Sequence, residues 1–138
     1  MKELSLGDLV VRRRVVDADA MHLFGQLVGD QNPIHHDDQA ARAAGFKGPI
    51  AYGMVTGSLF SEILGNELPG PGAVYASQSF KFLAPIYVGE EIELRVEVIA
   101  VRKDQRVVTV RTSCMTSDGS LCLDGEAVLV RREVGERL

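Results

Sequence analysis

The stretch from Glu91 to Arg102 reads EIELRVEVIAVR, and its first eight residues alternate strictly between charged and apolar side chains. A period of two is typical of a β-strand with one face in the core and one face in water. Other segments with strand character are 9–16, 73–82, 106–116 and 121–132. Turn residues at 103–105 and 118–119 join the last three strands into hairpins. We therefore expect an antiparallel sheet of about five strands or more.

The first half of the chain favours helices. Asp17 is a typical N-cap for a helix that ends at Gly29, and a second, short helix is expected over 37–44. The longest helix is expected over 54–66, and its apolar residues form no single narrow stripe, which favours a core helix wrapped by other elements. Those apolar residues are Met54, Val55, Leu59, Ile63 and Leu64. This order of elements indicates an α+β domain with the long helix along the concave side of the sheet.

Composition limits the class of protein. The chain has 138 residues, of which 46% are hydrophobic and 25% charged, so we expect one domain over residues 1–138. The formal net charge is −4 and no basic stripe is present, which argues against a nucleic-acid partner. The polar start of the chain and the lack of a bilayer-length apolar window predict a cytoplasmic protein with no membrane partner.

Two cysteines flank a turn in the last hairpin. A two-residue loop at Asp118 and Gly119 would place Cys122 opposite Met115 rather than opposite Cys114. We therefore expect two buried, reduced thiols.

A loop built to turn sharply carries an acid and a base. It reads Gly29-Asp30-Gln31-Asn32-Pro33-Ile34-His35. Pro33 fixes its own φ and keeps Asn32 out of the helical region, so these two residues shape the loop. Asp30 and His35 could then hold one water between them, which suits addition or elimination of water. In the alternative interpretation, Asp30 caps a turn and His35 is an ordinary polar residue at a helix start.

The same region is dense in potential metal ligands. They are Asp30, His35, His36, Asp37 and Asp38. Their spacing matches no closed tetrahedral set and no cysteine joins them, so we expect no metal. We expect His36 to be a surface residue at a helix N-terminus and the two following aspartates to serve the dipole of that helix. His22 is expected to be structural.

Gly53 stands where an irregular segment turns into the long helix. Its N–H is therefore among the unsatisfied donors at the positive end of the helix, where it could polarise a carbonyl oxygen. A glycine here could also do no more than permit the sharp turn. Gly57, Ser61 and Leu64 follow near one face of the helix, and the room beside the small residues could hold an acyl chain or a packed neighbouring strand.

The loop at 29–35, followed by GPIAYGM at 48–54, resembles the MaoC-like (R)-specific enoyl-CoA hydratases. The likeness continues through PIYVGEE at 85–91 and covers nearly the whole chain. It is a likeness to the short single-domain hydratases, which supply (R)-3-hydroxyacyl-CoA from fatty acid β-oxidation. It implies a hotdog fold, in which a bent antiparallel sheet wraps around a long helix, and a homodimer. One departure is Tyr52, because the family commonly has histidine at this place.

The resemblance also implies a reaction. Asp30 and His35 would activate one water, and the Gly53 N–H would hold the thioester oxygen. The expected function is reversible (R)-specific hydration of trans-2-enoyl-CoA, and no cofactor is expected. The expected partner is the thioester substrate, carried by CoA or by acyl carrier protein. The alternatives are an (R)-3-hydroxyacyl-[acyl-carrier-protein] dehydratase, an acyl-CoA thioesterase, and a non-catalytic hotdog protein that binds acyl thioesters.

Overall fold

An antiparallel sheet of six strands dominates the structure, a computed structural model that describes residues 1–133. The strands lie in the order β1-β4-β5-β6-β2, and β3 also pairs with β6. They are β1 (Leu9–Val15), β2 (Ala73–Gln78), β3 (Lys81–Phe82), β4 (Glu91–Val101), β5 (Val107–Thr116) and β6 (Leu121–Arg131). The sheet and the hairpins predicted from the alternation are confirmed.

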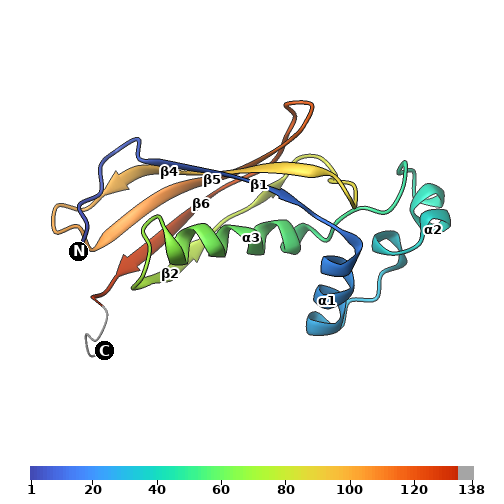
Figure 1. Ribbon diagram of the computed structural model, residues 1–138, viewed down its shortest axis with the longest axis horizontal. Helices are drawn as coiled ribbons and strands as arrows, with labels where there is room; N and C mark the ends of the chain where they lie inside the picture. The colour runs from blue at the N-terminus through green and yellow to red at the C-terminus, as the bar shows by residue number, and fades with distance from the viewer. Residues whose placement is uncertain (134–138) are drawn as a thin grey trace.

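The helices come from the first half of the chain, as predicted. They are α1 (Ala18–Val28), the 3-10 helix η1 (Pro33–His35), α2 (Asp38–Ala43) and α3 (Gly53–Asn66). Asp17 caps α1 by accepting from the Ala20 N–H, and Gly29 ends that helix with a φ of 78°. Figure 1 shows α3 along one face of the sheet, with α1 and α2 gathered beyond one end of it. Within residues 1–133, no helix is long and apolar enough to span a bilayer.

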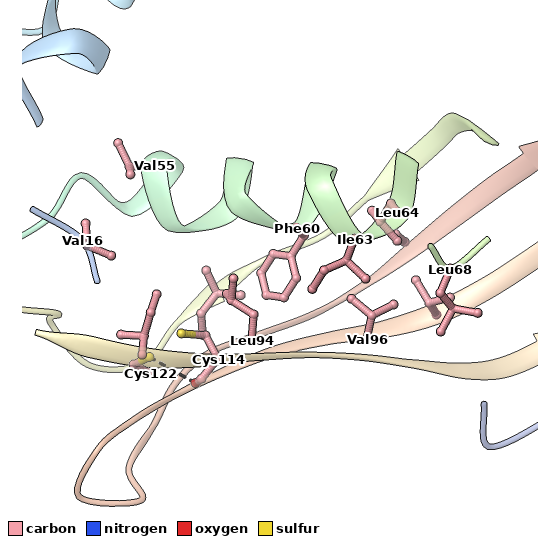
Figure 2. Packing of buried hydrophobic residues seen from close by; sticks show 14 of the residues in the cluster. Val16, Val55, Phe60, Ile63, Leu64, Leu68, Leu94, Val96, Cys114 and Cys122 are labelled. Carbon is pink, nitrogen blue, oxygen red and sulfur yellow. Dashed lines mark hydrogen bonds between the residues drawn. The ribbon is translucent and has the colours of Figure 1, made fainter. Parts of the chain in front are cut away.

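The core lies between α3 and the sheet. Phe60, Ile63 and Leu64 face the sheet residues, among them Leu94 and Val96 (Figure 2). The other side of α3 is open, and Met54 is 55% exposed. The expected long core helix packed along the sheet is confirmed, and within residues 1–133 the sheet covers one side of this helix.

The segment 73–82, expected as one strand, is interrupted at residues 79–80. There the Ser79 carbonyl oxygen comes so close to Gly125 of β6 that an added Cβ would lie 1.8 Å from it. The Ser79 N–H donates to the Glu126 oxygen over 2.8 Å, which holds the bend against β6. A close approach of two backbones that only glycine permits therefore divides the predicted strand into β2 and β3.

Replacing Gly125 by alanine should lower the free energy of unfolding by about 3 kcal/mol, because the backbone of β2 and β3 must move to clear the new methyl group. Gly65 in α3 is the matched control, since a Cβ there would meet nothing within 4 Å. Gly65→Ala should raise stability by about 0.5–1 kcal/mol, as expected for glycine in a helix interior. Urea denaturation of both variants measures the difference, and similar effects at the two sites would contradict the prediction.

The last hairpin has a three-residue loop rather than the expected two. The Thr116 N–H donates to the Ser120 oxygen over 3.0 Å, so Met115 pairs with Leu121 and the predicted pairing with Cys122 is wrong. Cys122 lies at the register shift that follows, and its Sγ donates to the Cys114 carbonyl over 3.1 Å (Figure 2). Both thiols are buried and free, as predicted.

Candidate active site

A cavity of about 580 Å³ opens beside the N-terminus of α3. Asp30, His35 and Gly53 all line it, so the fold brings together the carboxylate, the imidazole and the helix-start glycine identified in the sequence. Most of the other lining side chains are apolar: Phe24, Val28, Met54 and Phe82. An apolar cavity with a few convergent polar groups is the usual form of a small-molecule site.

The Asp30 carboxylate is held at one oxygen and open at the other. Its Oδ1 accepts the Asn32 N–H over 2.9 Å, and the Asn32 side chain in turn accepts the Ile34 N–H over 3.3 Å. Asn32 is thereby the N-cap of η1 and Pro33 its first residue. No hydrogen bond within the described chain uses Oδ2 of Asp30, so this oxygen can accept a proton from a bound water.

The His35 ring is fixed in one tautomer by its partner. Its Nδ1 lies 2.7 Å from the Ile50 carbonyl oxygen. A carbonyl only accepts, so Nδ1 carries the hydrogen, and in the neutral ring Nε2 carries a lone pair. This atom has no partner among residues 1–133 and can accept a hydrogen bond from the second hydrogen of the same water.

Gly53 is the first residue of α3, and its N–H makes no hydrogen bond within residues 1–133. The donor lies at the positive end of the helix, in a residue that lines the cavity, which suits an oxyanion. The Phe82 ring lies close to Gly53, and a Cβ added at this glycine would be 2.9 Å from it. Gly53, His35 and Phe82 also line a second cavity of about 360 Å³, together with the buried Thr56.

Two further side chains join the site, and their contacts were not predicted. Tyr52 is only 3% exposed, and its hydroxyl contacts both the Asp30 backbone oxygen and the His36 ring. Burial and the nearby Asp30 carboxylate raise the pKa of Tyr52 above its ordinary value, so the hydroxyl keeps its hydrogen. The expectation that His36 is a surface residue is wrong, because the ring is half-buried between Tyr52 and a stacking contact with His22.

The two aspartates after the loop serve α2. Asp37 caps the helix by accepting from the Ala40 N–H over 3.1 Å, and Asp38 pairs with Arg42 at 2.8 Å. Within residues 1–133, no three His, Cys, Asp or Glu side chains are grouped so that they could hold a metal ion.

The three residues considered for an acyl pocket separate in the structure. Gly57 and Ser61 line a groove of about 310 Å³ between α3 and β2. Leu64 is 2% exposed and belongs to the core. At Gly57 the Phe80 ring already occupies the space beside the helix, since a Cβ there would lie 2.7 Å from it.

Comparison with known proteins agrees with this geometry. The family model described as a MaoC like domain matches residues 8–118. An (R)-specific enoyl-CoA hydratase of Aeromonas caviae is 43% identical over 77% of this chain and 79% of the relative. A mitochondrial 3-hydroxyacyl-[acyl-carrier-protein] dehydratase of Arabidopsis thaliana is 36% identical over 92% of this chain and 77% of the relative. The solved (R)-hydratase of A. caviae matches with a TM-score of 0.91 at 37% identity, covering 96% of this chain and 100% of that one. The chain therefore belongs to the MaoC-like family and has the hotdog fold of the (R)-hydratases.

Proposed function

We propose that this protein hydrates trans-2-enoyl-CoA to (R)-3-hydroxyacyl-CoA and catalyses the reverse dehydration. One observation carries the proposal: a single cavity is lined by three residues that carry an open carboxylate oxygen, an imidazole nitrogen with a free lone pair and an unpaired helix N–H. These are the groups needed to hold a water and to polarise a thioester. The high identity to an (R)-specific enoyl-CoA hydratase supports the same reaction and its stereochemistry.

The chemistry follows from the three groups. A water between Asp30 Oδ2 and His35 Nε2 gives a hydrogen to each and directs an oxygen lone pair toward C3 of the substrate. Asp30 takes a proton as the hydroxyl adds at C3, and the electrons of the double bond move onto the thioester oxygen, where the Gly53 N–H stabilises the enolate. The proton that Asp30 took is then delivered to C2, while His35 Nε2 keeps the new hydroxyl group in place by a hydrogen bond. One water has been added across the double bond, on the face where both residues lie, and both return to their initial protonation states.

The direct test is hydration of crotonyl-CoA, followed by the loss of enoyl absorbance and by chiral analysis of the product. We expect (R)-3-hydroxybutyryl-CoA and no release of free CoA. Release of CoA would support the thioesterase alternative instead. Binding of acyl-CoA without turnover of any enoyl thioester would support a non-catalytic acyl-thioester protein.

The carrier of the acyl group separates this proposal from its nearest rival. The similarity to a plant 3-hydroxyacyl-[acyl-carrier-protein] dehydratase favours the same chemistry on a protein-bound chain. Comparison of kcat/KM for crotonyl-CoA and for crotonyl-acyl carrier protein distinguishes the two. We expect the CoA thioester to be the better substrate.

We propose the groove between α3 and β2 as the path of the acyl chain. Ser61 lies on its wall, so Ser61→Phe should narrow it and lower kcat/KM for trans-2-octenoyl-CoA about 10-fold, while crotonyl-CoA is little affected. Asn66→Phe is the control, because Asn66 is exposed at the end of α3 and does not line the groove. Equal losses for the short and long substrates would argue against this path.

We also propose a cytoplasmic homodimer that forms along β2. This strand lies at one end of the sheet, and its Val74 and Tyr75 are 50% and 45% exposed, next to the open side of α3. An exposed apolar edge strand is a typical surface for pairing with a second copy. Light scattering should give about twice the chain mass of 15.0 kDa, and Val74→Lys should shift the protein toward the monomer. Cell fractionation tests the location.

A further inference from the structure

The Tyr52 hydroxyl stands at a junction between three segments of the chain. It donates to the Asp30 backbone oxygen over 2.6 Å, and His36 Nε2 lies 2.7 Å away. A phenol has one hydrogen, which here goes to the Asp30 carbonyl, so His36 Nε2 must be the donor in the second bond. The hydrogen bonds therefore run from His36 through Tyr52 to the peptide of Asp30.

The ring of Tyr52 contacts the other residue of the pair. The centroids of the Tyr52 and His35 rings are 3.8 Å apart, and their planes differ by 29°. Phe24 also packs against Tyr52, at a centroid distance of 5.1 Å. His35 is thus fixed at one ring face by Tyr52 and at Nδ1 by Ile50, which leaves one direction for its open Nε2.

Gly25 in α1 provides the space for this junction. A Cβ at Gly25 would lie 2.9 Å from the Tyr52 hydroxyl, 3.2 Å from the Asp30 oxygen and 3.6 Å from His36 Nε2. The Tyr52 hydroxyl, the Asp30 oxygen and His36 Nε2 therefore lie close to α1 at a position where the helix has no side chain. Glycine destabilises a helix interior relative to alanine. Its presence at this position therefore makes room for the junction and lowers the stability of α1.

We propose that Tyr52 is a positioning residue for hydration: its ring orients His35, and its hydroxyl, held by His36, sets the position of the Asp30 loop. The inference rests on the hydratase function proposed above. One side chain thereby links both groups that hold the water. A small displacement of either group removes the water from its attacking position, so the hydroxyl affects the chemical step more than substrate binding.

Tyr52→Phe tests the hydroxyl, because phenylalanine keeps the ring against His35 and removes only the hydrogen bonds. We expect kcat for crotonyl-CoA to fall about 10-fold while KM changes less than about 2-fold. Tyr87→Phe is the matched control. Its hydroxyl accepts the Lys47 N–H over 3.2 Å and lies outside the residues that line the two cavities at Gly53, so kcat should be retained.

A pair of His36 variants tests the same junction from the other side. His36→Gln keeps an N–H donor at a similar reach and should retain most of kcat, whereas His36→Leu has no donor and should lose as much as Tyr52→Phe. The double variant Tyr52→Phe/His36→Leu should lose little more than either single variant, since both remove the same connected bonds. A merely structural role would not distinguish glutamine from leucine.

The outcomes separate the inference from the function. Wild-type kcat in Tyr52→Phe, or equal losses in His36→Gln and His36→Leu, would overturn the positioning role while leaving the hydratase function in place. If Tyr52→Phe does not fold, the two His36 variants decide alone. Absence of hydration by the wild-type protein would overturn the proposed function and this inference together.

Discussion

Replacing Asp30 by asparagine is expected to lower kcat for crotonyl-CoA about 1000-fold, because an amide cannot take a proton from the attacking water. The substitution is nearly isosteric. The asparagine oxygen can still accept the Asn32 N–H, now bonded to Oδ1 of Asp30, so the loop should keep its shape. The measurement is hydration of crotonyl-CoA at saturating substrate, with thermal unfolding recorded in parallel to verify the fold.

Asp37→Asn is the matched control for this change. Asp37 lies in the same region and also accepts a backbone N–H, that of Ala40, and the substitution removes the same charge. Asparagine is a good N-cap, so α2 should remain stable and the activity should change little. Near-wild-type turnover in Asp30→Asn, or an equal loss in Asp37→Asn, would contradict the assignment of Asp30 as the base.

The elements with local signals are the ones that the sequence predicts well. The alternation over Glu91 to Val98 identifies β4, and the cap at Asp17 with the stop at Gly29 bounds α1 within a residue. The division of the segment 73–82 has no local signal. It depends on Gly125, which is far away in the chain and meets Ser79 only after β6 has paired.

The candidate active site shows the same difference between features that have a local sequence signal and contacts that form only in the folded chain. Asp30 and His35 share one loop whose turn residues can be identified from the sequence, and Gly53 can be placed at a helix start. The contact of Tyr52 with His36 joins a helix start to the end of a 3-10 helix, and no spacing rule predicts it. The resemblance to the family marks Tyr52 only as a departure, and its hydrogen-bonding role becomes evident only when α1, the loop and α3 are packed together.

The Gly53 N–H is the second group whose loss should have a large effect. Gly53→Pro removes this donor, and we expect kcat for crotonyl-CoA to fall about 100- to 1000-fold, as for other oxyanion donors. The backbone can accept proline, because Gly53 is the first residue of α3 and Tyr52 has φ −57° and ψ 130°, which are compatible with a following proline. Steady-state kinetics with crotonyl-CoA, together with the unfolding temperature, measures the effect.

Gly53→Ala is the control that separates the hydrogen-bond donor from steric crowding. Both substitutions place a Cβ about 2.9 Å from the exposed Phe82 ring, which must turn aside in each variant. Only the alanine variant keeps the N–H. A much larger loss of kcat in the proline variant therefore measures the stabilisation of the enolate oxygen by this donor, whereas equal losses would show that the closeness of Phe82, and not the donor, makes glycine necessary at the start of α3.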